Sequence, residues 1–179
     1  AVTFSSTIDG AQTFQVSTSG LTTMLGRVGS ATTLSSLQID GSSTISTDTI
    51  KTLNNQTYQG AASITQGLTL TSTANGNITF GSTLNGAFSL TASTGGTTTF
   101  SSTVGNSSAL TSITVTNSDG TQSTGPTIIA ASISTTGAQT YSGPISLAGN
   151  ATLSSSSGSD ITFASTIDGA KALTVHTAG

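Results

Sequence analysis

Hydrophobic and polar residues alternate in short runs along much of the chain. Examples are Phe14-Gln15-Val16, Leu68-Thr69-Leu70 and Ile161-Thr162-Phe163, each of which reads apolar, polar, apolar. Successive side chains of a β-strand point to opposite faces, so this pattern predicts strands with one buried and one solvated face. The runs are rich in β-branched residues and interrupted by Gly, which favours strands over helices.

Asp-Gly and Asn-Gly pairs separate many of these runs. They occur at Asp9-Gly10, Asp40-Gly41, Asn85-Gly86, Asp119-Gly120 and Asp168-Gly169. Gly adopts positive φ at little cost, and Asp and Asn favour turns, so the pairs predict sharp corners between strands. Such pairs are also typical of β-hairpins, which makes a meander of hairpins the main alternative fold.

A 17-residue segment occurs in three similar copies along the chain. FSSTIDGAQTFQVSTSG starts at Phe4, FGSTLNGAFSLTASTGG at Phe80 and FASTIDGAKALTVHTAG at Phe163. The copies lie 76 and 83 residues apart (80 − 4 and 163 − 80). The repetition predicts two modules, residues 4–79 and 80–162, and the start of a third at 163–179, within one continuous segment 1–179.

The change of offset places seven extra residues between Val115 and Ile128. Beyond that point, an offset of 83 pairs Ile45 with Ile128, and it pairs QTYQG (56–60) with QTYSG (139–143). The intervening stretch 116–126 is polar and rich in turn residues. An insertion that leaves both flanks in register is predicted to be a loop on the outside of a repeating scaffold.

A shorter period of about twenty residues lies inside each module, as between the F-x-S-T segments at Phe80 and Phe100. A period of this length, built from short alternating runs, is typical of a β-solenoid. We therefore expect an all-β parallel β-helix with coils of about 20 residues. Equivalent residues would then stack over one another around a narrow apolar core, which a meander of hairpins would not achieve.

Composition excludes several classes of function. The net charge is −3 with three basic residues, so no basic patch can neutralise nucleic-acid phosphates. No apolar run is long enough for a membrane span, so we expect no membrane insertion in this segment. The chain has no Cys and a single His, His176, and its six acids are all Asp, four of which precede Gly. We therefore expect no metal site, no cofactor and no catalytic residues.

Threonine content raises the alternative of an ice-binding β-solenoid. Thr69-Leu70-Thr71 and Thr114-Val115-Thr116 are candidate T-x-T runs. Ice binding would need such runs at the same place in each coil. One module later, however, Leu153 is followed by Ser154 where Leu70 is followed by Thr71. This comparison disfavours an ice-binding face.

The three copies of F-x-S-T-aliphatic-[DN]-G-A, with QTYxG and ITF between them, resemble the repeats of filamentous-haemagglutinin-like, β-strand-repeat bacterial surface adhesins. The resemblance implies a right-handed parallel β-helix, secretion to the bacterial cell surface and no catalysis in the repeat region. It implies host or bacterial surface glycans or proteins as partners of the fibre. Neighbouring repeats of the same chain, associated end to end, are further partners that we expect.

The resulting expectation is a structural stalk segment of a large secreted adhesin, acting as a rigid spacer in adhesion or biofilm contact. Two alternatives remain open besides ice binding. The first is a glycan- or surface-binding module, with a candidate contact loop formed by Asn117, Ser118, Asp119, Gly120, Thr121 and Gln122. The second is a polysaccharide-active β-helix enzyme, which the absence of Glu and of paired acids with basic partners disfavours.

Overall fold

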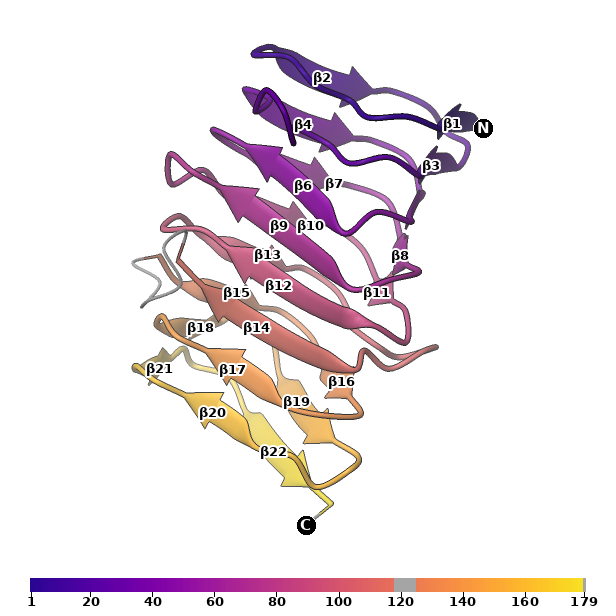
Figure 1. Cartoon of the computed structure of the whole chain (residues 1–179). Coiled ribbons are helices and arrows are strands. Elements are labelled where there is room, and N and C mark those ends of the chain that lie inside the picture. The colour runs from indigo at the N-terminus through magenta and orange to yellow at the C-terminus, as the bar shows by residue number, and fades with distance from the viewer. Residues whose placement is uncertain (118–124, 179) are drawn as a thin grey trace.

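The computed structural model describes residues 1–117 and 125–178. These residues form 22 short β-strands and no helix. Every pairing between the described strands is parallel, which excludes the meander of hairpins, since hairpins pair antiparallel strands. The strands stack into an elongated coil with the N-terminus at one end and the C-terminus at the other (Figure 1).

The coil has three faces, each a parallel sheet that runs along its length. Face A contains β1 (Val2–Phe4), β3 (Thr22–Met24), β5 (Ser43–Ile45), β8 (Ala62–Ile64) and β11 (Leu84–Asn85), followed by β16 (Ile133–Thr135), β19 (Ala151–Ser155) and β22 (Leu173–Thr177). Val104 joins the two parts of face A, because it forms parallel bridges to Leu84 and to Ile133.

Face B contains β6 (Thr49–Thr52), β9 (Leu68–Ser72), β12 (Ser89–Ser93), β14 (Ser112–Thr116), β17 (Gln139–Tyr141) and β20 (Ile161–Phe163). Ile8 and Val28 extend this face toward the N-terminus, since Ile8 bridges Val28 and Val28 bridges Ile50.

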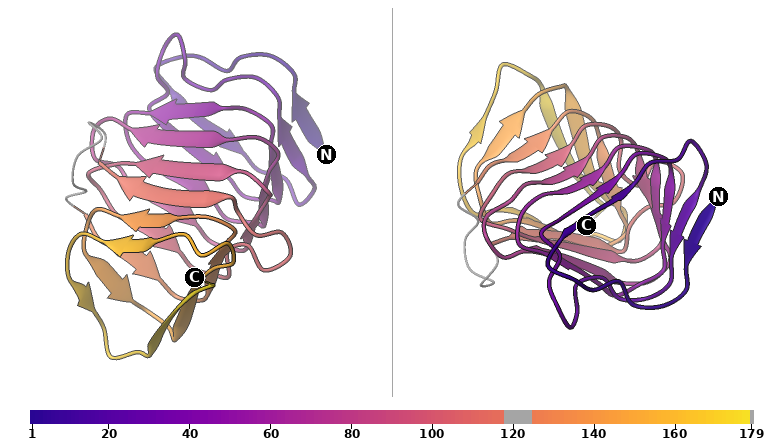
Figure 2. Two further views of the ribbon diagram at one scale, coloured as in Figure 1. Left: turned by 60° about the horizontal axis from the view of Figure 1, so that its bottom comes forward. Right: turned by 90° about the horizontal axis from the view of Figure 1, so that it is seen from above.

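Face C contains β2 (Thr13–Val16), β4 (Ser36–Ile39), β7 (Gln56–Tyr58), β10 (Ile78–Phe80), β13 (Thr98–Phe100), β15 (Thr127–Ile129), β18 (Ile145–Leu147) and β21 (Ile167–Asp168). The chain visits faces C, A and B in that order and then starts the next turn. The eight strands of face C correspond to about eight turns of about 22 residues. This arrangement, with its right-handed winding, confirms the predicted parallel β-helix (Figure 2).

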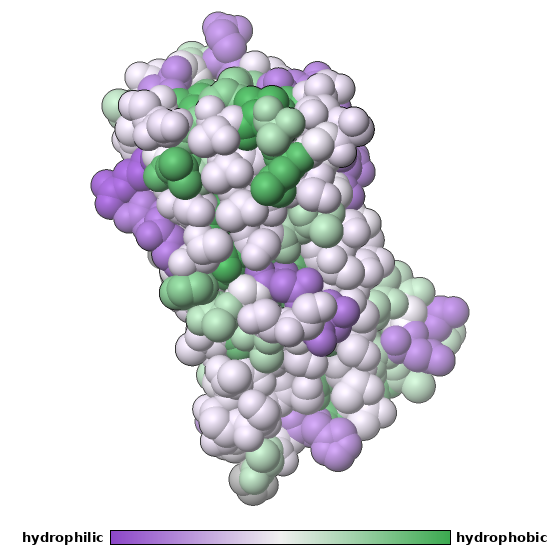
Figure 3. Space-filling model, turned by 90° about the vertical axis from the view of Figure 1, so that its right-hand side faces the viewer, coloured by the Kyte–Doolittle hydropathy of each residue, from purple (hydrophilic) through white to green (hydrophobic). Residues whose placement is uncertain are grey.

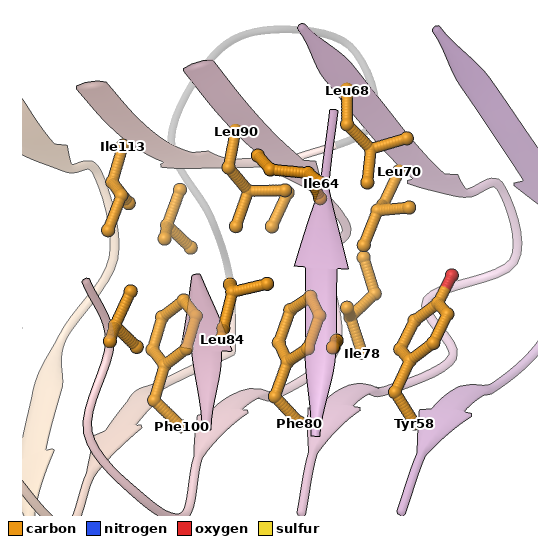
Figure 4. Close-up of a cluster of buried hydrophobic side chains, with 14 of the residues drawn as sticks. Tyr58, Ile64, Leu68, Leu70, Ile78, Phe80, Leu84, Leu90, Phe100 and Ile113 are labelled. Carbon is orange, nitrogen blue, oxygen red and sulfur yellow. The ribbon is translucent and has the colours of Figure 1, made fainter. Parts of the chain in front are cut away.

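The core is the narrow interior that the three faces enclose. Most strands between β3 and β19 show the burial pattern expected from alternation, with buried residues on either side of an outward one. On face C, the rings of Tyr58, Phe80 and Phe100 stack with centroids 5.1 and 5.6 Å apart. Leu68, Leu70 and Leu90 approach this stack from face B (Figure 4). Burying each such side chain stabilises the fold by about 1.5–3 kcal/mol.

The structure corrects one step of the predicted repeat. An offset of 83 pairs Ile45 with Ile128, but the buried counterpart of Ile45 is Ile129, which is 0% exposed, whereas Ile128 points outward. The offset is therefore 84 at this strand (129 − 45) and returns to 83 at Ile133, the counterpart of Ile50 (133 − 50). The spacing from Ile129 to Ile133 (133 − 129 = 4) is thus one residue shorter than the spacing from Ile45 to Ile50 (50 − 45 = 5), and the turn between the two strands absorbs the difference.

Candidate functional site: the outer surface of the solenoid

The outward residues form columns, because strands in successive turns are paired in register. Face B carries a column of six threonines, Thr49, Thr69, Thr91, Thr114, Thr140 and Thr162. The matching column of face C is mixed and runs through Gln15, Gln38, Thr57, Thr79, Thr99, Ile128, Ser146 and Asp168. Neighbouring rungs of such a column lie about 4.8 Å apart.

The threonine column of face B was not found from the sequence. The comparison that disfavoured it matched Leu70-Thr71 with Leu153-Ser154, but these pairs lie on different faces, in β9 on face B and β19 on face A. The true neighbours of Thr69 are Thr49 and Thr91, one turn away on either side. Residues one module apart are therefore not stacked, which is why the comparison failed.

Side-chain oxygens at the corners bind the backbone of the following turn. Asp9 Oδ1 accepts hydrogen bonds from the amides of Ala31 and Thr32 at 2.8 and 3.2 Å. Asn85 Oδ1, one module later, accepts from the amides of Ser107 and Ser108 at 3.0 and 3.3 Å. The Asp9-Gly10 and Asn85-Gly86 corners thus satisfy backbone amide donors that the strand ladders leave unpaired.

The charged groups are few, and those that the structure describes are at least partly exposed. Arg27 and Asp48 form an exposed ion pair with an N–O distance of 2.6 Å, and the hydrogen bonds from Arg27 hold the pKa of Asp48 below its ordinary value. A hydrogen bond from Gln38 and a weaker one from Gln15 lower the pKa of Asp40 despite an opposing desolvation effect. The exposed Arg27–Asp48 ion pair contributes little to the stability of the fold.

A buried polar cluster explains the QTYxG motif. Gln56 Nε2 donates to the carbonyl of Thr71 at 3.0 Å and to Thr52 Oγ1 at 3.2 Å, and the hydroxyl of Tyr58 donates to Gln56 Oε1. The second motif repeats the arrangement, with Gln139 Nε2 donating to the Ser154 carbonyl at 2.9 Å and Tyr141 donating to Gln139. Each cluster closes on itself inside the core, so its polar groups have a structural role.

Burial raises the pKa of both tyrosines of these clusters, Tyr58 and Tyr141. Both hydroxyls therefore stay protonated at neutral pH and remain hydrogen-bond donors to the glutamine side chains.

The described residues contain no ligand-sized pocket and no group of three or more residues suited to hold a metal ion. His176 is exposed on β22, where it stacks beside the outward Ser154. Figure 3 shows the side of face A, where near-neutral residues predominate and the strongest hydrophobic colour lies toward the N-terminal end. The side of the solenoid that Figure 3 shows is thus mainly near-neutral in hydropathy, with isolated hydrophilic residues.

The candidate contact loop is described only at its start. The carbonyl of Asn117 accepts a hydrogen bond of 2.6 Å from the Ser93 hydroxyl on face B. Ser118, Asp119, Gly120, Thr121 and Gln122 lie outside the described residues. Asn117 directly follows β14, at the corner between face B and face C.

The fold defines the class of this protein as a three-sided parallel β-solenoid. Comparisons with protein-family models, with curated proteins and with solved structures gave no match. Among the residues that the structure describes, no helix is long and apolar enough to cross a membrane.

Proposed function

We propose that this chain is a structural spacer segment of a large, secreted bacterial surface adhesin of the filamentous-haemagglutinin-like kind. The observation that supports the proposal is the single narrow core, which continues from turn to turn. The described part of the chain also has no pocket. The sequence resemblance set out above supports the placement at a bacterial surface.

The architecture suits a part that holds two ends apart. Hydrogen bonds between successive turns run along the axis on all three faces, so the rod resists bending on every side. Each turn contacts only its neighbours, so a longer array of the same turns would extend the rod without a new core. Length can therefore be added at constant cross-section, as a stalk requires.

Stretching single molecules between both termini tests the spacer function. The rod should bear load without lengthening until turns detach, and each detached turn of about 22 residues should release about 75 Å of chain. A Phe80→Ala variant is the matched control, because loss of the central stacked ring should lower the detachment force without altering the released length. Smooth lengthening at low force, as of a flexible chain, would overturn the proposal.

Binding to a glycan array distinguishes a spacer function from glycan binding by this segment of the fibre. Wild-type protein and a variant lacking residues 118–124 should both give only background signal. Binding by the wild-type protein that disappears with the deletion would assign the contact function to this loop.

The threonine column of face B supports ice binding as a second candidate function. Its six hydroxyl and methyl groups repeat at the spacing of the turns, which is a regular array that ordered water could match. An ice-recrystallisation assay decides the question. Inhibition by wild-type protein that Thr91→Lys abolishes and Thr79→Lys on face C preserves would favour this candidate over the spacer.

A further inference from the structure

Strands that are equivalent in the repeat lie on different faces of the solenoid. The segments VTF, ITF and ITF form β1, β10 and β20, which begin the three copies of the repeated motif. In space, β1 belongs to face A, β10 to face C and β20 to face B. A module therefore does not end above the place where it began.

The same change of face holds throughout the module. Equivalent strands 76 to 84 residues apart move from A to C (β3 to β13, β5 to β15 and β8 to β18), from C to B (β2 to β12, β4 to β14 and β7 to β17) and from B to A (β6 to β16, β9 to β19 and β12 to β22). Each equivalence is a move by one face in the same direction.

Counting the sides of the coil gives the size of the step. From β1 to β10 the chain makes nine steps between named strands, and Ile8 and Val28 add two further sides on face B, which makes eleven. From β10 to β20 it makes ten such steps, and Val104 adds one side on face A, which again makes eleven. Since three sides make one turn, we infer that each module spans three and two-thirds turns.

The corners change position in the same way. Gly41 and Gly60 lie at the corner between faces C and A, where a Cβ on Gly60 would meet the Gly41 carbonyl carbon at 2.5 Å. Gly125, the counterpart of Gly41, lies with Gly96 at the corner between faces B and C, where a Cβ on Gly125 would meet the Gly96 carbonyl oxygen at 2.2 Å. A close approach needed at one corner in the first module is thus needed at another corner in the second.

The consequence concerns how a repeated surface is presented. Equivalent outward residues of successive modules lie on three different faces, and three modules, or eleven turns, return them to the starting face. In a series of such modules, the outward residues that recur in every module are therefore distributed over all three faces. This geometry stands independently of the spacer function.

Distances between spin labels test the inference in the protein itself. The chain has no native Cys, so labels can be attached to pairs of introduced cysteines. Thr3, Thr79 and Thr162 are the equivalent outward residues of β1, β10 and β20. Because these residues lie on three different faces, the three labels do not fall on one line, and the Thr3–Thr162 distance should be clearly shorter than the sum of the other two distances.

The matched control uses three labels on one face. Gln15, Thr79 and Ser146 lie in the column of face C, with three turns between each successive pair. Here the longest distance should equal the sum of the other two within the reach of the label. Additive distances in the Thr3, Thr79 and Thr162 set as well would place all three on one side and overturn the inference.

Discussion

Buried hydroxyl groups differ in whether the core offers them a partner. The glutamine–tyrosine clusters satisfy their own donors and acceptors. Among the described residues, five other buried hydroxyls make no hydrogen bond, on Thr22, Ser43, Thr98, Thr127 and Ser155. Four of them stack in two pairs at equivalent places of the two modules, Thr22 beside Ser43 on face A and Thr98 beside Thr127 on face C. A buried hydroxyl without a partner lowers stability.

At the scale of the residue, Thr98→Val should therefore raise the free energy of unfolding by about 1 kcal/mol. The reason is that valine keeps the branched shape and removes a hydroxyl with no partner, and Ile78, the register neighbour of Thr98, shows that an aliphatic side chain fits this position. Urea denaturation measures the effect. Thr99→Val, on the outward position next to it, should leave stability almost unchanged, and a lower stability of Thr98→Val than of wild type would contradict the argument.

Corners decide how closely successive turns approach. Paired strands of successive turns lie about 4.8 Å apart, so the chain at some corners passes close to the backbone of the previous turn. Gly96 lies at the corner between β12 and β13, where a Cβ would meet the backbone oxygen of Asn75 at 2.3 Å. No side chain fits there without moving the backbone of one turn away from the other.

Gly96→Ala should consequently lower the free energy of unfolding by about 1–3 kcal/mol, as expected for overpacking against a rigid neighbour. Thermal unfolding followed by circular dichroism reports the change. Gly67→Ala is the control, because the nearest atom to its Cβ would be the hydroxyl oxygen of Ser89 at 3.1 Å, which can rotate away. Equal effects of the two substitutions would show that close approach at the corner does not matter.

The whole molecule is a one-dimensional stack with weak ends. Leu70 and Ile78 in the middle are 0% exposed, whereas Ile167 and Val175 in the last turn are 39% and 45% exposed. A middle turn is covered on both sides, and the first and last turns on one side only. In such arrays stability depends on contacts between neighbours, so opening should begin at the ends.

Hydrogen exchange should therefore vary along the axis. Amides of the strands between β7 and β14 should exchange slowest, and those of β20 to β22 should exchange faster by on the order of 10-fold or more. Exchange followed by mass spectrometry of peptides resolves the turns. Uniform protection along the chain would mean that the solenoid opens as one unit and that its ends are not weak points.

Much of this architecture is visible in the sequence because its signals are local. Alternation in a run such as Leu68-Thr69-Leu70 defines a strand and its inward side, and the copies at Phe4, Phe80 and Phe163 define the repeat. The candidate outer surface was less predictable. The column through Thr49, Thr69 and Thr91 joins residues 20 and 22 positions apart, and no single period in the sequence connects them.

The sequence by itself determined where many of the strands lie, the buried side of most of these and which segments are copies of one another, because bond geometry and hydrophobicity act within a few residues. Only the tertiary structure decided which face each strand joins, and hence which residues are neighbours on the surface. That choice depends on how many sides close a turn around the core and how many residues each corner uses. In β15 the buried residue is Ile129, where the repeat offset predicts Ile128. One residue more or less at a corner thus changes which residue faces the core.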